Sequence, residues 1–233
     1  MAKNQVADGL AKHEALSKQE AFFVKNKKVI LGVVAAVIVV IAGLFIYKAY
    51  VSGPREEKAS TALARGQEYF NAEQFDKALN GDGAGYTGFV KIASDYSSTD
   101  AGNLANLYAG LCYANLNKWA EAVKYLEAFS PSSDAMLSPA ATSALAHAYV
   151  QTGNIDKAVS TLKKAASMAD SHASDGANIS LSPTFLLQAG QLLESQNKKA
   201  EALKIYQNIK EKYVASVLVQ SQEIDKYIER VSE

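Results

Sequence analysis

The chain of 233 residues has little of the chemistry on which enzymes and metal proteins depend. It contains one cysteine, so no intramolecular disulfide can form, and the apolar helical pattern around Cys112 predicts a small buried core residue. Its three histidines, His13, His147 and His172, lie in separate segments and outside any spacing typical of metal ligands. No serine stands in a Gly-x-Ser-x-Gly turn. We therefore expect no metal, no cofactor, no small-molecule substrate and no enzymatic activity.

An excess of positive charge is also missing from most of the chain. From residue 49 onward there are 17 lysines and arginines against 21 aspartates and glutamates. Nucleic-acid binding needs clustered basic side chains against phosphates, so this mildly acidic part is not expected to bind nucleic acid. The glycines in residues 81–85 loosely suggest a phosphate loop, but no strand precedes them and Lys91 is misplaced. We interpret them as a flexible insertion.

Charge is absent altogether from residues 29–47, the run VILGVVAAVIVVIAGLFIY. As a helix this run is about 28 Å long, close to the hydrocarbon thickness of a bilayer. A cleaved signal peptide is disfavoured, because 28 residues come first and no small-x-small site follows. A buried core helix is disfavoured by the length and by the lack of a polar stripe. The sequence predicts a cytoplasmic tail over 1–28 and a transmembrane helix over 29–48.

The orientation follows from the lysines on either side of this run. The tail holds six lysines, and Lys25, Lys27 and Lys28 directly precede the apolar residues. Because positive charge near a span favours the cytoplasmic side, we expect the tail in the cytoplasm and the C-terminal domain outside it. A short tail and one span are typical of a bacterial inner membrane protein with a periplasmic domain.

The rest of the chain repeats a helical pattern four times. A small residue stands three positions before a large one, in the pairs Gly66/Tyr69, Gly110/Tyr113, Ala146/Tyr149 and Gly190/Leu193. An alanine follows each small residue by 12 positions, at Ala78, Ala122, Ala158 and Ala202. Small residues let two helices approach closely, and polar turn signals fall between them. The pattern resembles the tetratricopeptide repeat, a helix–turn–helix unit of 34 residues.

This resemblance covers residues 59–213 and implies an all-α protein, in which one transmembrane helix precedes a tetratricopeptide-repeat α-solenoid. Insertions are expected at 80–85, within the second helix of the first repeat, and at 170–178, before the fourth repeat. Residues 49–58 are either a short linker or the start of the first repeat helix. Residues 214–233 are predicted to form a capping helix that covers the last open face of the stack.

In this fold the first helix of each repeat lines a groove that binds peptides. Mapping from the small residue of each repeat predicts a mixed apolar and amide groove without lysine or arginine. Its expected members are Gln67, Phe70, Leu107, Leu111, Asn115, His147, Gln151, Leu187, Gln191 and Glu194, with Leu63 and Ser143 at the equivalent inner positions. For each apolar member, packing between repeats is an equally good interpretation. Such a surface suits an extended peptide or an amphipathic helix.

The whole plan resembles the YfgM family of ancillary subunits of the Sec translocon. The shared points are Phe22-Phe23 and Asn26-Lys27 before the span, the single span itself and the repeats beyond it. The resemblance implies an adaptor that passes translocated proteins to periplasmic chaperones. Its expected partners are Sec translocon subunits, a membrane-bound periplasmic chaperone and translocating chains. A structural scaffold for envelope or cell-division assembly is the alternative that the sequence leaves open.

Overall fold

The computed structural model describes residues 18–232, and all regular secondary structure within that range is helical. The chain divides into two compact units, residues 1–54 and 55–233. Residues 1–17 of the expected cytoplasmic tail lie outside the described part. The first unit supplies the apolar helix and the second supplies the repeats, which confirms the all-helical, repeat-based fold class.

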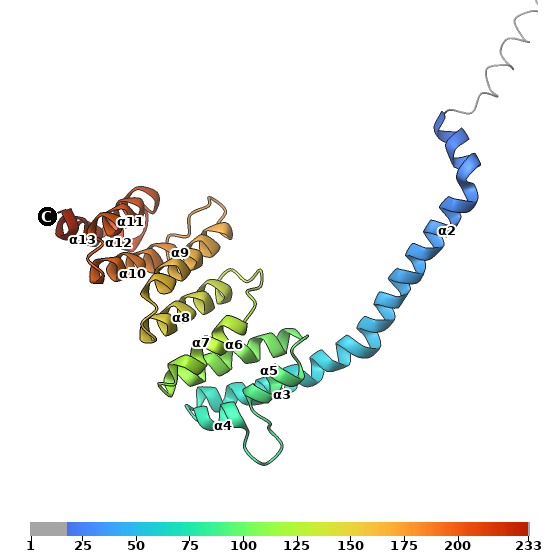
Figure 1. The fold of residues 1–233 in the computed structure, drawn as a ribbon, viewed down its shortest axis with the longest axis horizontal. Coiled ribbons are helices and arrows are strands. Elements are labelled where there is room, and N and C mark those ends of the chain that lie inside the picture. Colours follow the sequence, from blue (N-terminus) through green and yellow to red (C-terminus); the bar gives the residue numbers. More distant parts are fainter. Residues whose placement is uncertain (1–17, 233) are drawn as a thin grey trace, which may run out of the picture. The chain divides into compact units, whose positions relative to one another are not determined.

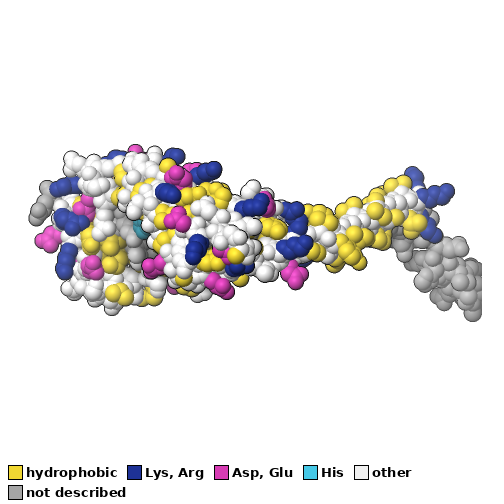
Figure 2. Space-filling model, turned by 90° about the horizontal axis from the view of Figure 1, so that it is seen from below, with side chains coloured by type: hydrophobic (Ala, Val, Ile, Leu, Met, Phe, Trp, Pro, Cys, Tyr) yellow, Lys and Arg dark blue, Asp and Glu magenta, His cyan; other side chains and the backbone are white. Residues whose placement is uncertain are grey.

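The first unit is built on α2 (Lys18–Tyr47), followed by five π-helical residues, η1 (Lys48–Ser52). α2 starts before the apolar run, so residues 18–28 of the expected tail are also helical. Valine, isoleucine and leucine side chains are exposed along residues 29–47, and Figure 2 shows them as a continuous hydrophobic zone with basic side chains at both ends. Within the described residues, this is the one helix that is long and apolar enough to cross a membrane.

The second unit is a stack of helix pairs that follow one another along the chain (Figure 1). The first pair is α3 (Gly53–Asn71) with a second helix in two parts, α4 (Phe75–Asn80) and α5 (Phe89–Asp95). The other pairs are α6 (Asp100–Asn115) with α7 (Trp119–Ala128), α8 (Leu137–Gln151) with α9 (Ile155–Ser171), and α10 (Ser182–Ser195) with α11 (Lys199–Lys212). Residues 53–58 therefore belong to the first repeat helix.

Close approach within each pair depends on the small residue of the sequence pattern. A Cβ atom added at Gly110 would lie 2.6 Å from Cγ of Leu126, and one at Gly190 would lie 2.2 Å from Cε1 of Tyr206. At Gly66 the obstructing groups are the rings of Tyr86 and Phe89. At Gly110 and Gly190 the second helix fills the space that a missing side chain leaves on the first, and at Gly66 this space is filled by Phe89 of α5 and Tyr86 of the α4–α5 connection.

The four alanines of the pattern lie at the centre of this packing. Ala78, Ala122, Ala158 and Ala202 have no exposed surface. Leu162 follows Ala146 by the same 16 positions that separate Gly110 from Leu126, and it too is fully buried. The core is therefore a row of small residues and large fillers that repeats along the stack, as the sequence predicted.

The turn inside each pair has the same backbone geometry in all four repeats. The seventh residue after the small one has a positive φ: 57° at Glu73, 58° at Asn117, 76° at Gly153 and 59° at Asn197. In the second repeat, the Asn117 amide donates to the carbonyl of Ala114 and the Lys118 amide to that of Tyr113, and the other three turns match. These paired bonds form a Schellman motif, which satisfies carbonyls at the helix end.

The insertion in the first repeat is held by one carboxylate rather than being a free loop. Asp82 accepts hydrogen bonds from the amides of Ala84 (2.7 Å) and Tyr86 (2.9 Å) and from the hydroxyl of Tyr69 (2.8 Å). Arg65 of α3 forms an ion pair with it at 2.5 Å. Oδ1 accepts the two amides within the insertion, and Oδ2 binds Tyr69 and Arg65 of α3, so the insertion expected to be flexible is anchored to the first repeat helix through one carboxylate oxygen.

The C-terminal cap consists of two short helices rather than the single expected one. α12 (Val217–Gln220) and α13 (Glu223–Ser232) are separated at Gln222, whose φ of 59° is incompatible with a continuous helix. α13 packs against α11 and buries Ile224 and Val231. Val217, which begins the separate helix α12, is 80% exposed.

Candidate interaction surface

Side-chain hydrogen bonds link α3 to α6, α8 to α10, and α10 to α13, and these helices lie on one surface of the stack. We call the surface formed by α3, α6, α8, α10 and α13 the first-helix face. Gln67 donates to the hydroxyl of Tyr108 (2.9 Å), and Gln191 donates to that of Tyr227 (3.2 Å). His147 is bonded to Gln188 (3.2 Å between Nε2 and Oε1). The structure therefore brings residues from separate repeats together here.

At the N-terminal end of this face the expected groove residues are aromatic and half-buried. Phe70 packs edge-on against Phe75 and against Tyr108, with ring centroids 5.6 and 5.3 Å apart. Gln67 is also half-buried, since its amide is engaged with Tyr108. Leu63, expected at the inner position, is buried in the core of the repeat. At this end, therefore, Gln67 and Phe70 already contact other side chains of the protein, and only part of each side chain is accessible to a ligand.

In the middle of the face, the second-repeat residues divide between core and surface. Leu107 is only 3% exposed and belongs to a core cluster with Leu126 and Ala141, so its side chain serves packing and is not open to a ligand. Leu111 is half-buried, and Asn115 is exposed with its amide donating to the Leu111 carbonyl (2.9 Å). Packing between repeats, the alternative interpretation of the sequence, therefore applies to Leu107.

Two of the third-repeat residues are accessible, as are Asn115 of the second repeat and Gln191 of the fourth. His147 and Gln151 are both exposed, one turn apart on α8. Ser143, the inner position of this repeat, is 5% exposed and faces the core. A ligand on this face would therefore meet an imidazole and an amide of the third repeat beside Leu111 of the second.

At the C-terminal end, Glu194 is occupied by contacts within the protein. Arg230 of α13 donates to both of its carboxylate oxygens at 2.8 and 2.9 Å, and the hydroxyl of Tyr206 donates to one of them. Burial raises the pKa of the Glu194 carboxyl, but the donors Arg230 and Tyr206 outweigh it and leave the pKa below its ordinary value. Leu187 is half-buried on the same helix. Glu194 thus joins α10 to the cap.

Four contributors to this face were not among the residues expected from the sequence: Tyr108, Gln188, Tyr227 and Arg230. Tyr108 and Gln188 directly follow the expected positions Leu107 and Leu187. Including the neighbours of each expected position would therefore have identified both residues from the sequence. Tyr227 and Arg230 were assigned to a cap, although their spacing of 36 residues from Gln191 and Glu194 is that of one repeat. That spacing is the signal for a fifth first helix.

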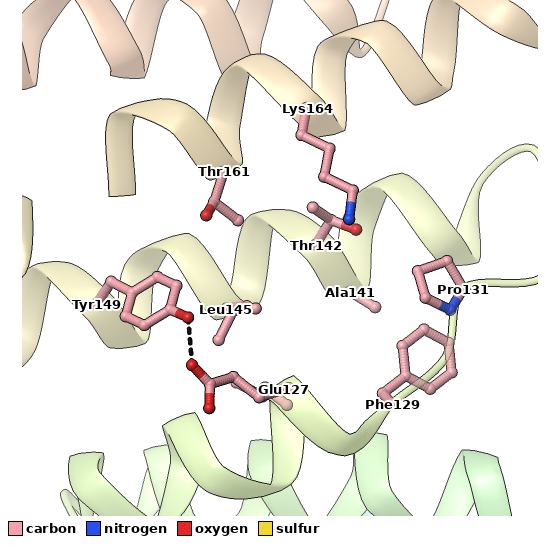
Figure 3. A pocket seen from close by; sticks show the side chains of 10 residues that line it. Glu127, Phe129, Pro131, Ala141, Thr142, Leu145, Tyr149, Thr161 and Lys164 are labelled. Carbon is pink, nitrogen blue, oxygen red and sulfur yellow. Dashed lines mark hydrogen bonds between the residues drawn. The ribbon is translucent and has the colours of Figure 1, made fainter. Parts of the chain in front are cut away.

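A separate hollow of about 230 Å³ lies between the second and third repeats, lined by α7, α8, α9 and the α7–α8 connection (Figure 3). The Tyr149 hydroxyl of α8 donates to the Glu127 carboxylate of α7, as the dashed line in Figure 3 marks. Burial, and then this bond, raises the pKa of Tyr149 to about 12. Phe129 and Pro131 form an apolar wall, and Lys164 extends toward it from α9. The hollow thus lies between two repeats, and the hydrogen bond from Tyr149 to Glu127 joins those repeats at its side.

Across residues 18–232 there is no group of three or more His, Cys, Asp or Glu side chains arranged to hold a metal ion. Cys112 is fully buried, and burial raises the pKa of its thiol to about 12. What the first-helix face offers is a set of apolar, amide and imidazole side chains suited to non-covalent binding.

Comparisons with known proteins include two structural matches and one family match. Two crystal structures of nearly identical TPR-like repeats, from a Podosopora anserina protein assigned as a kinesin light chain, each match with a TM-score of 0.49 and 15% sequence identity. Each match covers 76% of this chain and 94% of the other. One of the two structures is of a point variant. A comparison with curated proteins yields no significant match.

A family model described as a tetratricopeptide repeat-like domain matches residues 20–223, which is most of the chain and includes all four helix pairs. Repeats of this kind are modules for protein–protein interaction. The chain belongs to the family of tetratricopeptide repeat-like domain proteins.

Proposed function

We propose that the protein is a membrane-anchored adaptor that binds other polypeptides on its first-helix face. The observation that carries this proposal is the character of the accessible side chains in the middle of that face. Leu111 is half-buried, Asn115, His147 and Gln151 are exposed, and none of them is a lysine, arginine, aspartate or glutamate. Apolar and amide groups suit a polypeptide, whose backbone offers both donors and acceptors.

Charge is not expected to drive this binding. Arg230 is the cation that the cap places on the face, and its guanidinium is occupied by both oxygens of Glu194. Repeat proteins that capture C-terminal carboxylates need free basic side chains in the groove, and the expected groove positions of this chain hold none. An extended segment or an amphipathic helix is therefore the better ligand.

The site of action follows from the apolar helix. We infer that α2 spans the inner membrane of a bacterium once, with the N-terminus in the cytoplasm and the repeats in the periplasm. The length and the uninterrupted apolar composition of residues 29–47 support the span. The lysines at 25, 27 and 28 support the orientation.

The partner is inferred from the resemblance in organisation. An anchored repeat domain with a neutral groove suits a place beside the Sec translocon, where it would receive emerging chains and pass them to periplasmic chaperones. The alternative is a scaffold for envelope or cell-division assembly, which would use the same face to hold one fixed partner. The two differ in whether the face contacts many secreted sequences or one.

A binding measurement with the full chain in mild detergent tests the groove. The probe is a permanently unfolded model polypeptide, and the variants are Leu111→Asp and Gln151→Asp. Each places a carboxylate on the surface that the bound polypeptide would cover and desolvate, so we expect binding to weaken by about tenfold, or roughly 1.4 kcal/mol. Binding by the unchanged protein should hardly vary with salt, because apolar contacts are not screened.

The matched control is Ser160→Asp, which adds the same charge at an exposed position on the second helix α9. It should leave binding unchanged. Binding that collapses in salt while both groove variants behave like this control would refute the proposed face and place the ligand on the charged exterior.

A further inference from the structure

The exposed large hydrophobic side chains of the repeat unit are not scattered over its surface. Within residues 55–232 they are five in number: Met136, Leu137, Ile179, Val214 and Val217. Met136 is 72% exposed and Val217 is 80% exposed, so these side chains contribute little to the core. Single exposed apolar residues are common on protein surfaces, whereas a group of them in one region marks an interaction site.

All five lie where a second helix connects to the next first helix. Met136 and Leu137 join α7 to α8, Ile179 joins α9 to α10, and Val214 and Val217 join α11 to α12. Helices alternate in direction along the stack, so these connections share one edge, and the turns inside the pairs share the other (Figure 1). We call the first of these the connection edge. The opposite edge carries polar turn residues such as Asn117 and Asn197.

Local structure holds these side chains at the surface. Asp134 accepts hydrogen bonds from the amides of Met136 (2.9 Å) and Leu137 (2.6 Å), which fixes the start of α8. Ile179 and Val217 line a hollow of about 280 Å³ together with Pro183, Ala215 and Leu218. In the same lining the hydroxyl oxygen of Ser216 is buried without a hydrogen-bond partner among the described residues.

The chain coming from the apolar helix enters the repeat unit at this same edge. Arg55 donates to the carbonyl of Asp95 at the end of α5 (2.7 Å). Glu56 accepts from the amides of Asp100 and Ala101 at the start of α6 (2.8 and 2.9 Å). Two residues of the first turns of α3 are therefore bound to the α5–α6 connection. A bilayer that holds residues 29–47 keeps this edge at high effective concentration near its surface.

We propose that the connection edge rests on the lipid surface of the membrane that the chain spans, with Met136, Ile179, Val214 and Val217 in the interfacial layer. This inference rests on the membrane anchorage proposed above. Apolar side chains at several separate points suit a planar lipid surface better than one protein pocket. The carboxylates Asp134 and Asp175 lie in the same connections, so apolar contact with zwitterionic lipid, rather than attraction to anionic lipid, drives the association.

Site-directed fluorescence in the full-length protein, reconstituted into phosphatidylethanolamine–phosphatidylcholine vesicles, tests this directly. Single cysteines replace Ile179 and Val217 and carry a small environment-sensitive dye. The native Cys112 does not compete, because it is buried and its thiol pKa is raised to about 12. Vesicles with brominated acyl chains then quench only dyes that contact lipid.

Lys118→Cys and Ala200→Cys are the matched controls, since both positions are exposed and lie beside the turns at the opposite edge. Ala42→Cys reports on the span itself. We expect brominated lipid to remove most of the fluorescence at positions 42, 179 and 217 and to leave positions 118 and 200 unchanged.

The outcomes that overturn the proposal are distinct from one another. Quenching at 42 without quenching at 179 and 217 refutes lipid contact by the edge and leaves the anchor standing. No quenching at 42 refutes the anchor and this proposal together. Dyes at 179 and 217 that are shielded from aqueous iodide but not quenched by brominated lipid would place a protein, rather than lipid, on the edge.

Discussion

A single missing methyl group at Gly110 sets the distance between α6 and α7. The space it leaves is filled by Leu126, which is 4% exposed and lies within 2.6 Å of where a Cβ would be. Three of the four repeats use glycine at this position and the third uses Ala146. The requirement for a small residue is therefore steric rather than conformational, since these glycines are helical.

Gly110→Ala should destabilise the protein by about 1–3 kcal/mol, because the new methyl group overpacks against Leu126. Leu126→Ala alone should cost about 2–5 kcal/mol through loss of a buried side chain. The double variant should be more stable than the sum of the two single effects predicts, since the truncated leucine makes room for the methyl group. Far-UV circular dichroism during denaturant unfolding in mild detergent measures all three, and strict additivity would contradict the packing.

Asp82 illustrates a residue whose role depends on charge. Amides of Ala84 and Tyr86 and the hydroxyl of Tyr69 hold the pKa of its carboxyl well below the ordinary range. A carboxyl with a lowered folded-state pKa contributes stability above its unfolded-state pKa, and this contribution disappears as pH falls toward the folded value. The insertion should therefore be anchored at neutral pH and loosened in acid.

Asp82→Asn tests this dependence on pH. We expect the variant to have a lower melting temperature than the unchanged protein at neutral pH, with a difference that shrinks below about pH 4, where an unfolded aspartate becomes protonated. Glu229→Gln is the control, because this exposed side chain lies on α13, away from the insertion. A difference between the Asp82 variant and the unchanged protein that stays constant down to pH 2 would mean that the charge of Asp82 has no part in stability.

At the scale of elements, the turn between paired helices is the most regular feature. Its left-handed residue is glycine once, asparagine twice and glutamate once. Glycine and asparagine adopt this conformation readily, whereas glutamate does so at a cost. The Schellman bonds of the first repeat therefore impose on Glu73 a conformation that its side chain disfavours.

Glu73→Gly should raise the stability of the protein by up to about 1 kcal/mol, because it relieves this strain. The matched control, Glu68→Gly, changes an exposed glutamate inside α3 and should lower stability by about 1 kcal/mol. Opposite shifts in melting temperature from the same substitution would establish the turn geometry. A loss of stability in both variants would contradict it.

The repeats could be predicted from the sequence because their packing is local. Gly110, Tyr113 and Ala122 contribute to the packing of one helix pair, so their spacing alone carries the information. The break at Gln222 could not be predicted, since the apolar periodicity continues through it and the burial of α13 on α11 determines where the helices end. The anchoring of the insertion by Asp82 likewise depends on Arg65 and Tyr69 of another helix.

The candidate groove could be predicted only in part. Its position on the first helices follows from the repeat register, and Asn115, His147 and Gln151 are exposed there. Leu107 could not be separated from them, because an apolar residue on a first helix has the same pattern whether it faces a ligand or the next repeat. The ion pair of Glu194 with Arg230 joins residues 36 positions apart, which a single repeat does not reveal.

At the scale of the whole molecule, the account combines an apolar helix with a stack of interaction repeats. In the proposed function, the apolar helix would restrict the repeats to the neighbourhood of one membrane, and the first-helix face would supply a neutral surface for polypeptides. An adaptor of this kind needs no catalytic residue, because its effect comes from holding partners close together. Its central claim is that secreted chains contact the first-helix face in the cell.

Photo-crosslinking in living cells tests that claim most directly. A photoreactive amino acid replaces Gln151 on the first-helix face or, as the matched control, Ser160 on the exposed side of α9. The account predicts adducts with newly translocated chains and Sec subunits from position 151, lost when secretion is blocked, and few from position 160. Equal adducts from both positions, or adducts at 151 only with wall or division proteins, would contradict it.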